Sequence, residues 1–188
     1  MWARDFGPFT VRQPDGRPAL VDTWYTSAER PEDDCVPEQL AESMAMPFCP
    51  AALFLDGGNL LSNGQGLLIA TYHLVTSNAD DDIQPELIRT NLGQLFGARE
   101  VVFLQPLIGE PTGHVDMFCT FVSADTVVVA SIDPAVDAEN ARILDHNAAR
   151  LASVRVGHKR LRVVRVRMSR HEDTVWRSYT NVVYANGL

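Results

Sequence analysis

The sequence has 188 residues, of which 46% are hydrophobic, and a formal net charge of −8. This length predicts one domain, residues 1–188, with a sizeable core, and the acidic balance excludes a general nucleic-acid binder, which would present basic patches. No apolar run reaches the roughly 18 residues of a membrane helix, and no signal-peptide pattern follows Met1. Three cysteines without metal-site spacing are typical of a reduced, cytoplasmic protein.

A unit of strand, turn, strand and helix recurs along the chain. The predicted units comprise strands 9–11 and 19–21 with helix 37–46; strands 52–55 and 67–70 with helix 85–96; strands 101–104, 117–122 and 126–131 with helix 135–153; and strands 161–166 and 178–184. Alternating strands and helices predict an α/β protein. The repetition favours modules arranged about an axis, and an ordinary α+β domain without a true repeat is the alternative.

Asp5 is the first candidate site residue. The pair Gly7-Pro8 predicts a turn directly after it, and Trp2 lies three residues before it. A carboxylate held on such a turn suits a planar cation, because carboxylates bind guanidinium through two parallel hydrogen bonds. The alternative is that Asp5 only caps the turn or pairs with a nearby arginine.

His114 and Asp116 are the second candidates, at the opening of a predicted strand. Alternate residues of a strand share a face, so both side chains are expected to point the same way. Histidine titrates near neutrality and transfers protons, and a carboxylate beside it either raises its pKa or holds a substrate. A surface His-Asp pair at a strand entrance is the alternative.

Two further segments are candidates for the lining of a pocket. Residues 56–59, Asp-Gly-Gly-Asn, interrupt two apolar segments, and paired glycines let the backbone approach a ligand closely; Asp56 and Asn59 are then lining residues, and a β-bulge is the alternative. Residues 178–181, Ser-Tyr-Thr-Asn, either line a site or form the edge of a strand. None of the cysteines, Cys35, Cys49 and Cys119, has the surroundings of an activated nucleophile.

Four segments, taken in order, resemble the agmatine deiminase and Porphyromonas-type peptidylarginine deiminase family. They are residues 2–8 (Trp-Ala-Arg-Asp-Phe-Gly-Pro), 56–59 with Asn-Gly-Gln-Gly at 63–66, 113–118 (Gly-His-Val-Asp-Met-Phe) and 178–181. The resemblance spans nearly the whole chain. It implies the pentein fold, a five-bladed α/β propeller of ββαβ-type modules, of which about three to four are expected in this incomplete chain.

The resemblance also implies an activity. In this family a cysteine thiolate attacks the central carbon of a guanidinium, ammonia leaves, and water resolves the thiouronium intermediate to a ureido product. Asp5 and Asp116 match the residues that hold the guanidinium, and His114 matches the general acid and base; Trp2 and Asn59 are expected to contact substrate. The expected partner is a small cationic guanidino compound, either agmatine, which gives N-carbamoylputrescine on the route to putrescine, or an arginine group, which gives citrulline.

No metal, cofactor, nucleic acid or membrane is implied, and a homo-oligomer is left open. The family nucleophile lies in a last module, after a glycine-rich stretch, and this sequence does not contain it. We therefore expect the chain to be an internal piece of a deiminase, inactive by itself. The alternative is a pentein that binds guanidino compounds without reacting with them, or one with a purely structural role.

Overall fold

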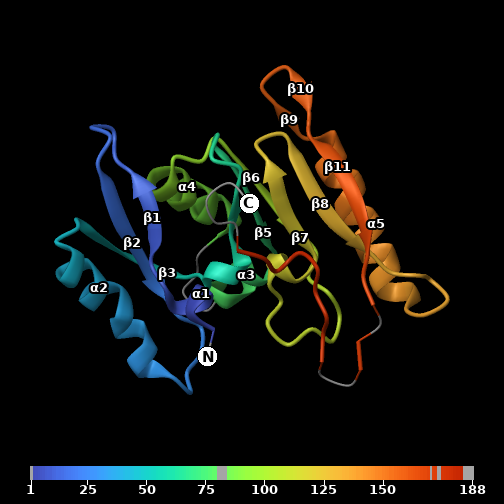
Figure 1. Ribbon diagram of the computed structural model, residues 1–188, viewed down its shortest axis with the longest axis horizontal. Helices are drawn as coiled ribbons and strands as arrows, with labels where there is room; N and C mark the ends of the chain where they lie inside the picture. The colour runs from blue at the N-terminus through green and yellow to red at the C-terminus, as the bar shows by residue number, and fades with distance from the viewer. Residues whose placement is uncertain (1, 80–83, 170, 173–174, 184–188) are drawn as a thin grey trace.

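The computed structural model describes residues 2–79, 84–169, 171–172 and 175–183, and it arranges them as three modules of the same kind (Figure 1). In each module two antiparallel strands are followed by a helix and then by a third strand, which pairs in parallel with the second. The order is therefore ββαβ, and the helix forms the crossover that a parallel pair requires.

The first module consists of β1 (Phe9–Arg12), β2 (Pro18–Trp24), α2 (Val36–Met44) and β3 (Phe48–Phe54). The second contains β4 (Leu61–Ser62), β5 (Leu67–Thr71), α3 (His73–Ser77), α4 (Pro85–Phe96) and β6 (Glu100–Leu104). The third contains β7 (Cys119–Ser123), β8 (Thr126–Ser131), α5 (Ala138–Ser153), the hairpin of β9 (Arg155–Val156) and β10 (Lys159–Arg160), and β11 (Arg162–Arg167).

Local chemistry explains where the elements begin and end. Helix α4 has Pro85 in its first turn and stops at Gly97, whose positive φ of 67° closes a helix without strain. Helix α5 starts three residues later than predicted, because the side chain of Asp137 accepts a hydrogen bond from Asn140 N and caps the helix there. At the β4–β5 turn Asn63 accepts bonds from two backbone N–H groups and donates to Ala124 O, which ties the second module to the third.

The strand prediction needs several corrections. Residues 52–55 do not open the second unit but close the first, since β3 pairs with β2. Residues 101–104 do not open the third unit but close the second, since β6 pairs with β5. Residues 161–166 likewise close the third module, since β11 pairs with β8, so the described chain holds three modules. Residues 178–183 form no strand, because the hydroxyl groups of Ser178 and Thr180 bind the local backbone and the Asp116 carbonyl instead; residues 184–188 lie outside the described residues.

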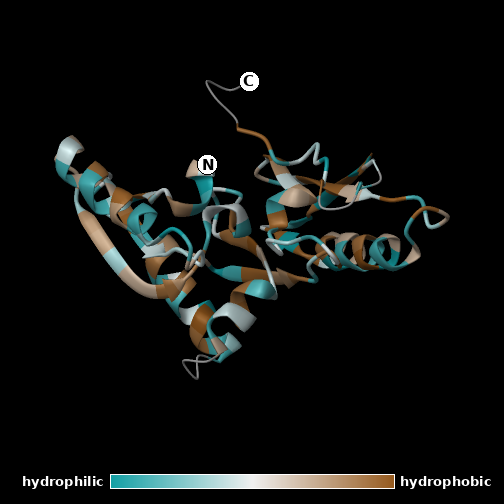
Figure 2. Cartoon of the chain, turned by 90° about the horizontal axis from the view of Figure 1, so that it is seen from below, coloured by the Kyte–Doolittle hydropathy of each residue, from teal (hydrophilic) through white to brown (hydrophobic). Residues whose placement is uncertain are grey.

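The main core lies between the second and third modules. It unites one face of β5 and β6 with β7, β8 and the inner face of α5, and it includes Phe118 and Leu144, both fully buried. In Figure 2 α5 shows alternating hydrophobic and hydrophilic bands, as expected of a helix with one face on a sheet. A second core holds the other face of β5 and β6 against α4, with Leu92 at its centre. Leu53 and Leu55, at the end of the first module, also belong to this second core, so all three modules contribute to the packed interior.

Truncation of Leu144 tests this packing. Leu144→Ala leaves a cavity in the main core and should lower the free energy of unfolding by about 2–5 kcal/mol. Leu87→Ala on α4 is the matched control, since Leu87 is 48% exposed and should cost less than about 1 kcal/mol. Urea denaturation measures both; equal losses would contradict the assignment of this core.

Candidate active site

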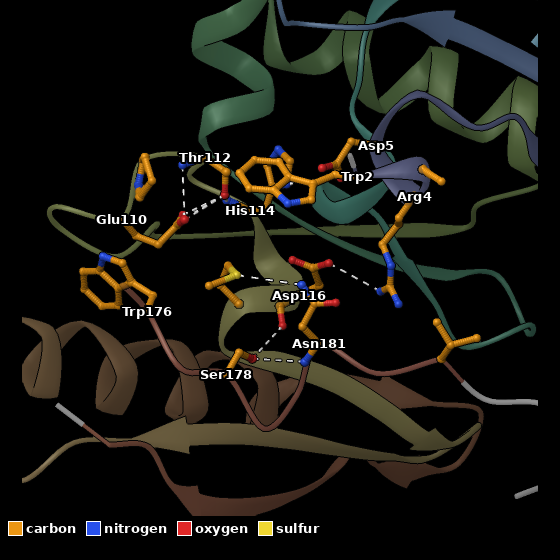
Figure 3. Close-up of a pocket in the computed structure, with 14 residues that line it drawn as sticks. Trp2, Arg4, Asp5, Glu110, Thr112, His114, Asp116, Trp176, Ser178 and Asn181 are labelled. Carbon is orange, nitrogen blue, oxygen red and sulfur yellow. Dashed lines mark hydrogen bonds and ion pairs between the residues drawn. The ribbon is translucent and has the colours of Figure 1, made fainter. Parts of the chain in front are cut away.

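Three short helical turns meet where the modules adjoin. They are α1 (Ala3–Phe6), the 3-10 turn η2 (Gly57–Asn59) and the 3-10 turn η4 (Val115–Met117). η2 contacts both of the others, and both 3-10 turns lie against β5. These turns carry or directly follow the predicted residues Asp5, His114 and Asp116, which are all buried (Figure 3). Segments more than a hundred residues apart in sequence thus form one site.

Gly58 lies at the point where the three side chains converge. A Cβ atom built on Gly58 would be 2.6 Å from Asp5 Oδ1, 2.6 Å from His114 Nδ1 and 3.0 Å from Asp116 Oδ2. Its backbone N–H donates a 2.9 Å hydrogen bond to Asp5 Oδ1. The glycine is therefore required by close approach of side chains to the backbone, as the Gly-Gly pattern suggested.

His114 is held between two carboxylates. Its Nε2 is 3.1 Å from Asp56 Oδ2, and its Nδ1 is 3.5 Å from Asp5 Oδ1. Asp56 is fixed in turn by Thr26, whose backbone N–H and hydroxyl both donate to it. The role of Asp56 as the partner of His114 was missed at the sequence level, where nothing in the spacing of residues 56 and 114 indicates contact.

Burial and charge set the protonation states of this pair. Burial by itself would lower the pKa of His114, but the hydrogen bond to Asp56 and the nearby charges of Asp5 and Asp116 raise it overall. Burial would raise the pKa of Asp56, yet the hydrogen bonds from His114 and Thr26 leave it lowered. Asp56 is therefore a stable anion that favours the protonated form of His114.

Asp116 has fewer side-chain hydrogen-bond and ion-pair partners than Asp5 or Asp56 in the described structure. Its Oδ2 is 3.4 Å from Arg4 Nη1, while its Oδ1 is buried and has no hydrogen-bond partner among the described residues. Burial raises the pKa of Asp116 to about 6, against the opposing effects of His114 and Arg4. Burial also raises the pKa of Asp5, and His114 and the Gly58 N–H offset only part of that rise. Both carboxylates are thus short of donors, which a cationic ligand would supply.

The backbone of Asp116 is anchored by the segment predicted as a strand edge. Thr180 Oγ1 donates to Asp116 O at 2.8 Å, and Ser178 Oγ lies 3.4 Å from the same oxygen. Ser178 also accepts bonds from the N–H groups of Thr180 and Asn181. These hydroxyl groups fix the position of η4 and close one side of the site.

The site opens into a cavity of about 490 Å³. Trp2, Asp5, His114 and Asp116 line it, as do Ser178 and Asn181 of the segment 178–181, whereas the other two predicted lining residues, Asp56 and Asn59, do not. Asn59 does not belong to the described lining, because its Oδ1 accepts hydrogen bonds from the N–H and hydroxyl of Thr71 and thereby holds η2 to β5. The sequence patterns did not single out Met117 as a lining residue. They also did not single out Arg4, Glu110 and Trp176, which complete much of the wall (Figure 3).

His114 and Asp116 line the same cavity, but they do not lie on the predicted strand. His114 has extended backbone directly before η4, and Asp116 lies within that turn; β7 begins only at Cys119. The preceding loop is braced by Glu110, which accepts hydrogen bonds from Thr112 and from Gly113 N. The prediction of a strand was wrong because these hydrogen bonds hold the backbone in a loop. The expectation that the two side chains point the same way agrees with their place in one cavity.

None of the three cysteines lines the cavity. Cys119 is buried in the main core, where burial strongly raises the pKa of its thiol, while Cys35 and Cys49 are exposed elsewhere on the surface.

Within the described ranges no group of His, Cys, Asp and Glu is arranged to hold a metal ion. The described helices also include none with the length and apolar character needed to cross a membrane.

Solved structures of known proteins share this fold. Agmatine deiminase of C. jejuni superposes on 99% of the chain with a TM-score of 0.80 at 19% identity, and the chain covers 57% of that protein. Agmatine deiminase of Enterococcus faecalis superposes on 99% with a TM-score of 0.76 at 20% identity, with 54% of its chain covered. The architecture is accordingly the pentein-type α/β fold of the deiminases, present here as three ββαβ modules.

Sequence comparison defines the family. The model of the Porphyromonas-type peptidyl-arginine deiminase family matches residues 1–188, and the chain belongs to this family. A Mycoplasma mycoides subsp. mycoides protein with the provisional name agmatine deiminase is 28% identical over 153 residues, which are 75% of this chain and 42% of that protein. The chain thus spans less than half the length of the curated relatives it matches.

Replacement of Asp56 tests the arrangement around His114. Asp56→Asn removes the charge that favours the imidazolium and should lower the pKa of His114, as measured by NMR titration of the imidazole. Because the folded pKa lies above the unfolded value of about 6.5, His114 contributes stability at lower pH that is lost as the pH rises through the folded pKa. Asp56→Asn should reduce that contribution.

Asp22→Asn is the matched control for Asp56→Asn. Asp22 is a part-buried carboxylate on β2 that does not line the cavity, so its replacement should leave the titration of His114 unchanged. A pKa of His114 that is the same in wild type and in Asp56→Asn would refute the assigned contact.

Substitution of Gly58 tests the convergence of the side chains. In Gly58→Ala the new Cβ must displace Asp5 and His114, which should cost about 1–3 kcal/mol of unfolding free energy and move the imidazole resonances of His114. Gly93→Ala within α4 is the comparison, since its Cβ would meet only Ala98 O, at 3.3 Å. Denaturation and NMR spectra report the two effects; an unperturbed His114 in Gly58→Ala would contradict the geometry.

Proposed function

We propose that this chain forms the guanidinium-binding and proton-transfer part of a deiminase that acts on agmatine or on an arginine group. The observation that carries the proposal is the buried carboxylate of Asp116, which lines the cavity beside Asp5 and His114 and has one oxygen without a partner in the described part of the chain. A guanidinium is a planar cation with five N–H donors, so it supplies further positive charge and hydrogen bonds to Asp5 and Asp116 beyond those from His114, Gly58 and Arg4.

In the proposed hydrolysis, Asp5 and Asp116 bind the substrate and His114 transfers protons. Asp5 and Asp116 orient the guanidinium and hold its charge in place while a thiolate adds to the central carbon. His114 gives a proton to the departing nitrogen, which leaves as ammonia, and then takes a proton from the water that attacks the thiouronium carbon. Expulsion of the thiolate yields the ureido product, so that water is consumed and ammonia is released without any change of oxidation state.

The attacking thiolate has to come from a residue outside these 188 positions, since none of the three cysteines lines the cavity. We accordingly assign residues 1–188 to part of a single pentein catalytic domain in a cytoplasmic enzyme without a cofactor. Relatives support this proposal: the C. jejuni and Enterococcus faecalis proteins are agmatine deiminases, and one C. jejuni structure is described as having substrate bound.

A guanidino-binding pentein without catalytic activity is the second candidate, and the absence of a cavity-facing thiol among the described residues favours it. The arrangement of His114 argues for the enzyme. A binder needs only the two carboxylates that face the cation, whereas Asp56 holds an imidazole beside them and raises its pKa. That contact suits proton transfer.

Calorimetry of guanidine binding tests the proposal on the chain itself. Agmatine should bind, and putrescine, which lacks the guanidinium, should bind at least about tenfold more weakly because charged hydrogen bonds are lost. Asp116→Asn should abolish the preference for agmatine over putrescine. Because a proton competes for Asp116, affinity should fall as the pH drops through about 6.

Asp22→Asn provides the control, because burial also raises the pKa of Asp22 to about 6 although this residue does not line the cavity. It should leave the affinity and its pH profile unchanged. Equal affinity for agmatine and putrescine would refute the guanidinium site. For the complete protein, colorimetric detection of the ureido product separates the two candidates. An enzyme forms the product, and its His114→Ala variant does not. A binding protein without activity forms no product in either case.

A further inference from the structure

A second hollow region lies between the second and third modules and is lined by arginines. Its main part has a volume of about 470 Å³ and is bordered by Arg89 of α4, Arg99 before β6 and Arg150 in the last turn of α5. An adjoining hollow of about 220 Å³ shares Arg99 and adds Arg155 of β9. Figure 1 shows α4 and β9 on either side of β6. We call this region the arginine groove.

The charge of the arginine groove is unbalanced. Four arginines are among the described residues that line its two parts, and Glu100 is the one carboxylate among them, so the described lining carries three more positive charges than negative ones. Within the described part of the chain none of these four arginines forms an ion pair. The chain has 24 acidic and 16 basic residues, so unpaired arginines gathered in one groove are not a consequence of composition.

Most of these guanidinium groups are already oriented. Arg89 donates to Val101 O, and its guanidinium carbon lies 4.5 Å from the centre of the Phe103 ring. Arg99 Nη2 donates to Gln65 O at 2.6 Å, and Arg155 Nη2 donates to His158 O at 2.7 Å. One carbonyl engages only part of a group with five N–H donors, so each arginine keeps donors for a ligand. The side chain of Arg150 has no hydrogen bond among the described residues.

We propose that the arginine groove binds a small anion that carries a diphosphate group. Guanidinium forks match the oxygens of phosphate in paired hydrogen bonds. A single carboxylate would leave two of the three excess charges unbalanced, whereas a diphosphate carries enough negative charge to balance them. The groove shares no lining residue with the candidate active-site cavity in the described chain, so the two sites are separate.

Calorimetry with inorganic pyrophosphate at fixed ionic strength tests the proposal. Pyrophosphate should bind one site, and Arg150→Gln should weaken it at least about tenfold through the loss of charged hydrogen bonds. Arg142→Gln, at an exposed position of the same helix and outside the groove lining, is the matched control and should retain wild-type affinity. Asp116→Asn should also retain it, which keeps this test independent of the deiminase proposal.

Arg89→Gln is a second variant, with the same expected loss. It also removes the contacts with Val101 and Phe103, so Arg150→Gln decides the outcome if that variant unfolds. Adenosine diphosphate in place of pyrophosphate identifies the source of the diphosphate: tighter binding indicates a nucleotide and equal binding indicates the free anion. The proposal is overturned by equal affinity in Arg150→Gln and Arg142→Gln, by binding no tighter than that of sulfate, or by tighter binding of a single-stranded oligonucleotide.

Discussion

The approach of three side chains to the backbone of Gly58 is the constraint on which the site depends. Asp5, His114 and Asp116 come from distant parts of the chain, and each lies within about 3 Å of the position where a Cβ would stand. A side chain at residue 58 would push them apart. The modules therefore have to bring α1, η2 and η4 together at one point. The main core holds η4 through Val115, and η2 contacts both η4 and α1.

This assembly places several carboxylates in a buried space, and their surroundings make them unequal. Asp56 is saturated by donors from His114 and Thr26, so its pKa is lowered despite burial. Oδ1 of Asp116 has no hydrogen-bond partner among the described residues, and the pKa of Asp116 is raised to about 6 although Arg4 lies 3.4 Å from its Oδ2. Asp56 therefore serves the histidine, whereas Asp116 keeps one oxygen available for a cation. In the arginine groove the charged groups without an ion-pair partner among the described residues are arginines, so that site suits an anion instead.

Much of the fold could be predicted from the sequence, because its signals are local. The bounds of α4 and β8 match the predicted ranges 85–96 and 126–131, since Pro85 and the turn before Thr126 mark them directly. The pairing of β3 with β2, and the contact between Asp56 and His114, depend on tertiary packing that no local pattern records. Asn59 was expected in the pocket, but its amide is taken up by Thr71, a partner twelve residues away.

The central claim is that Asp5 and Asp116 together hold a guanidinium group in this cavity. A crystal structure of the chain with agmatine would test it most directly. The account predicts that the guanidinium lies beside Gly58, with one N–H donating to Asp116 Oδ1, another donating to Asp5, and its central carbon open toward the cavity. Agmatine bound at another place, or oriented with its amine toward Asp116 and its guanidinium in solvent, would contradict the account.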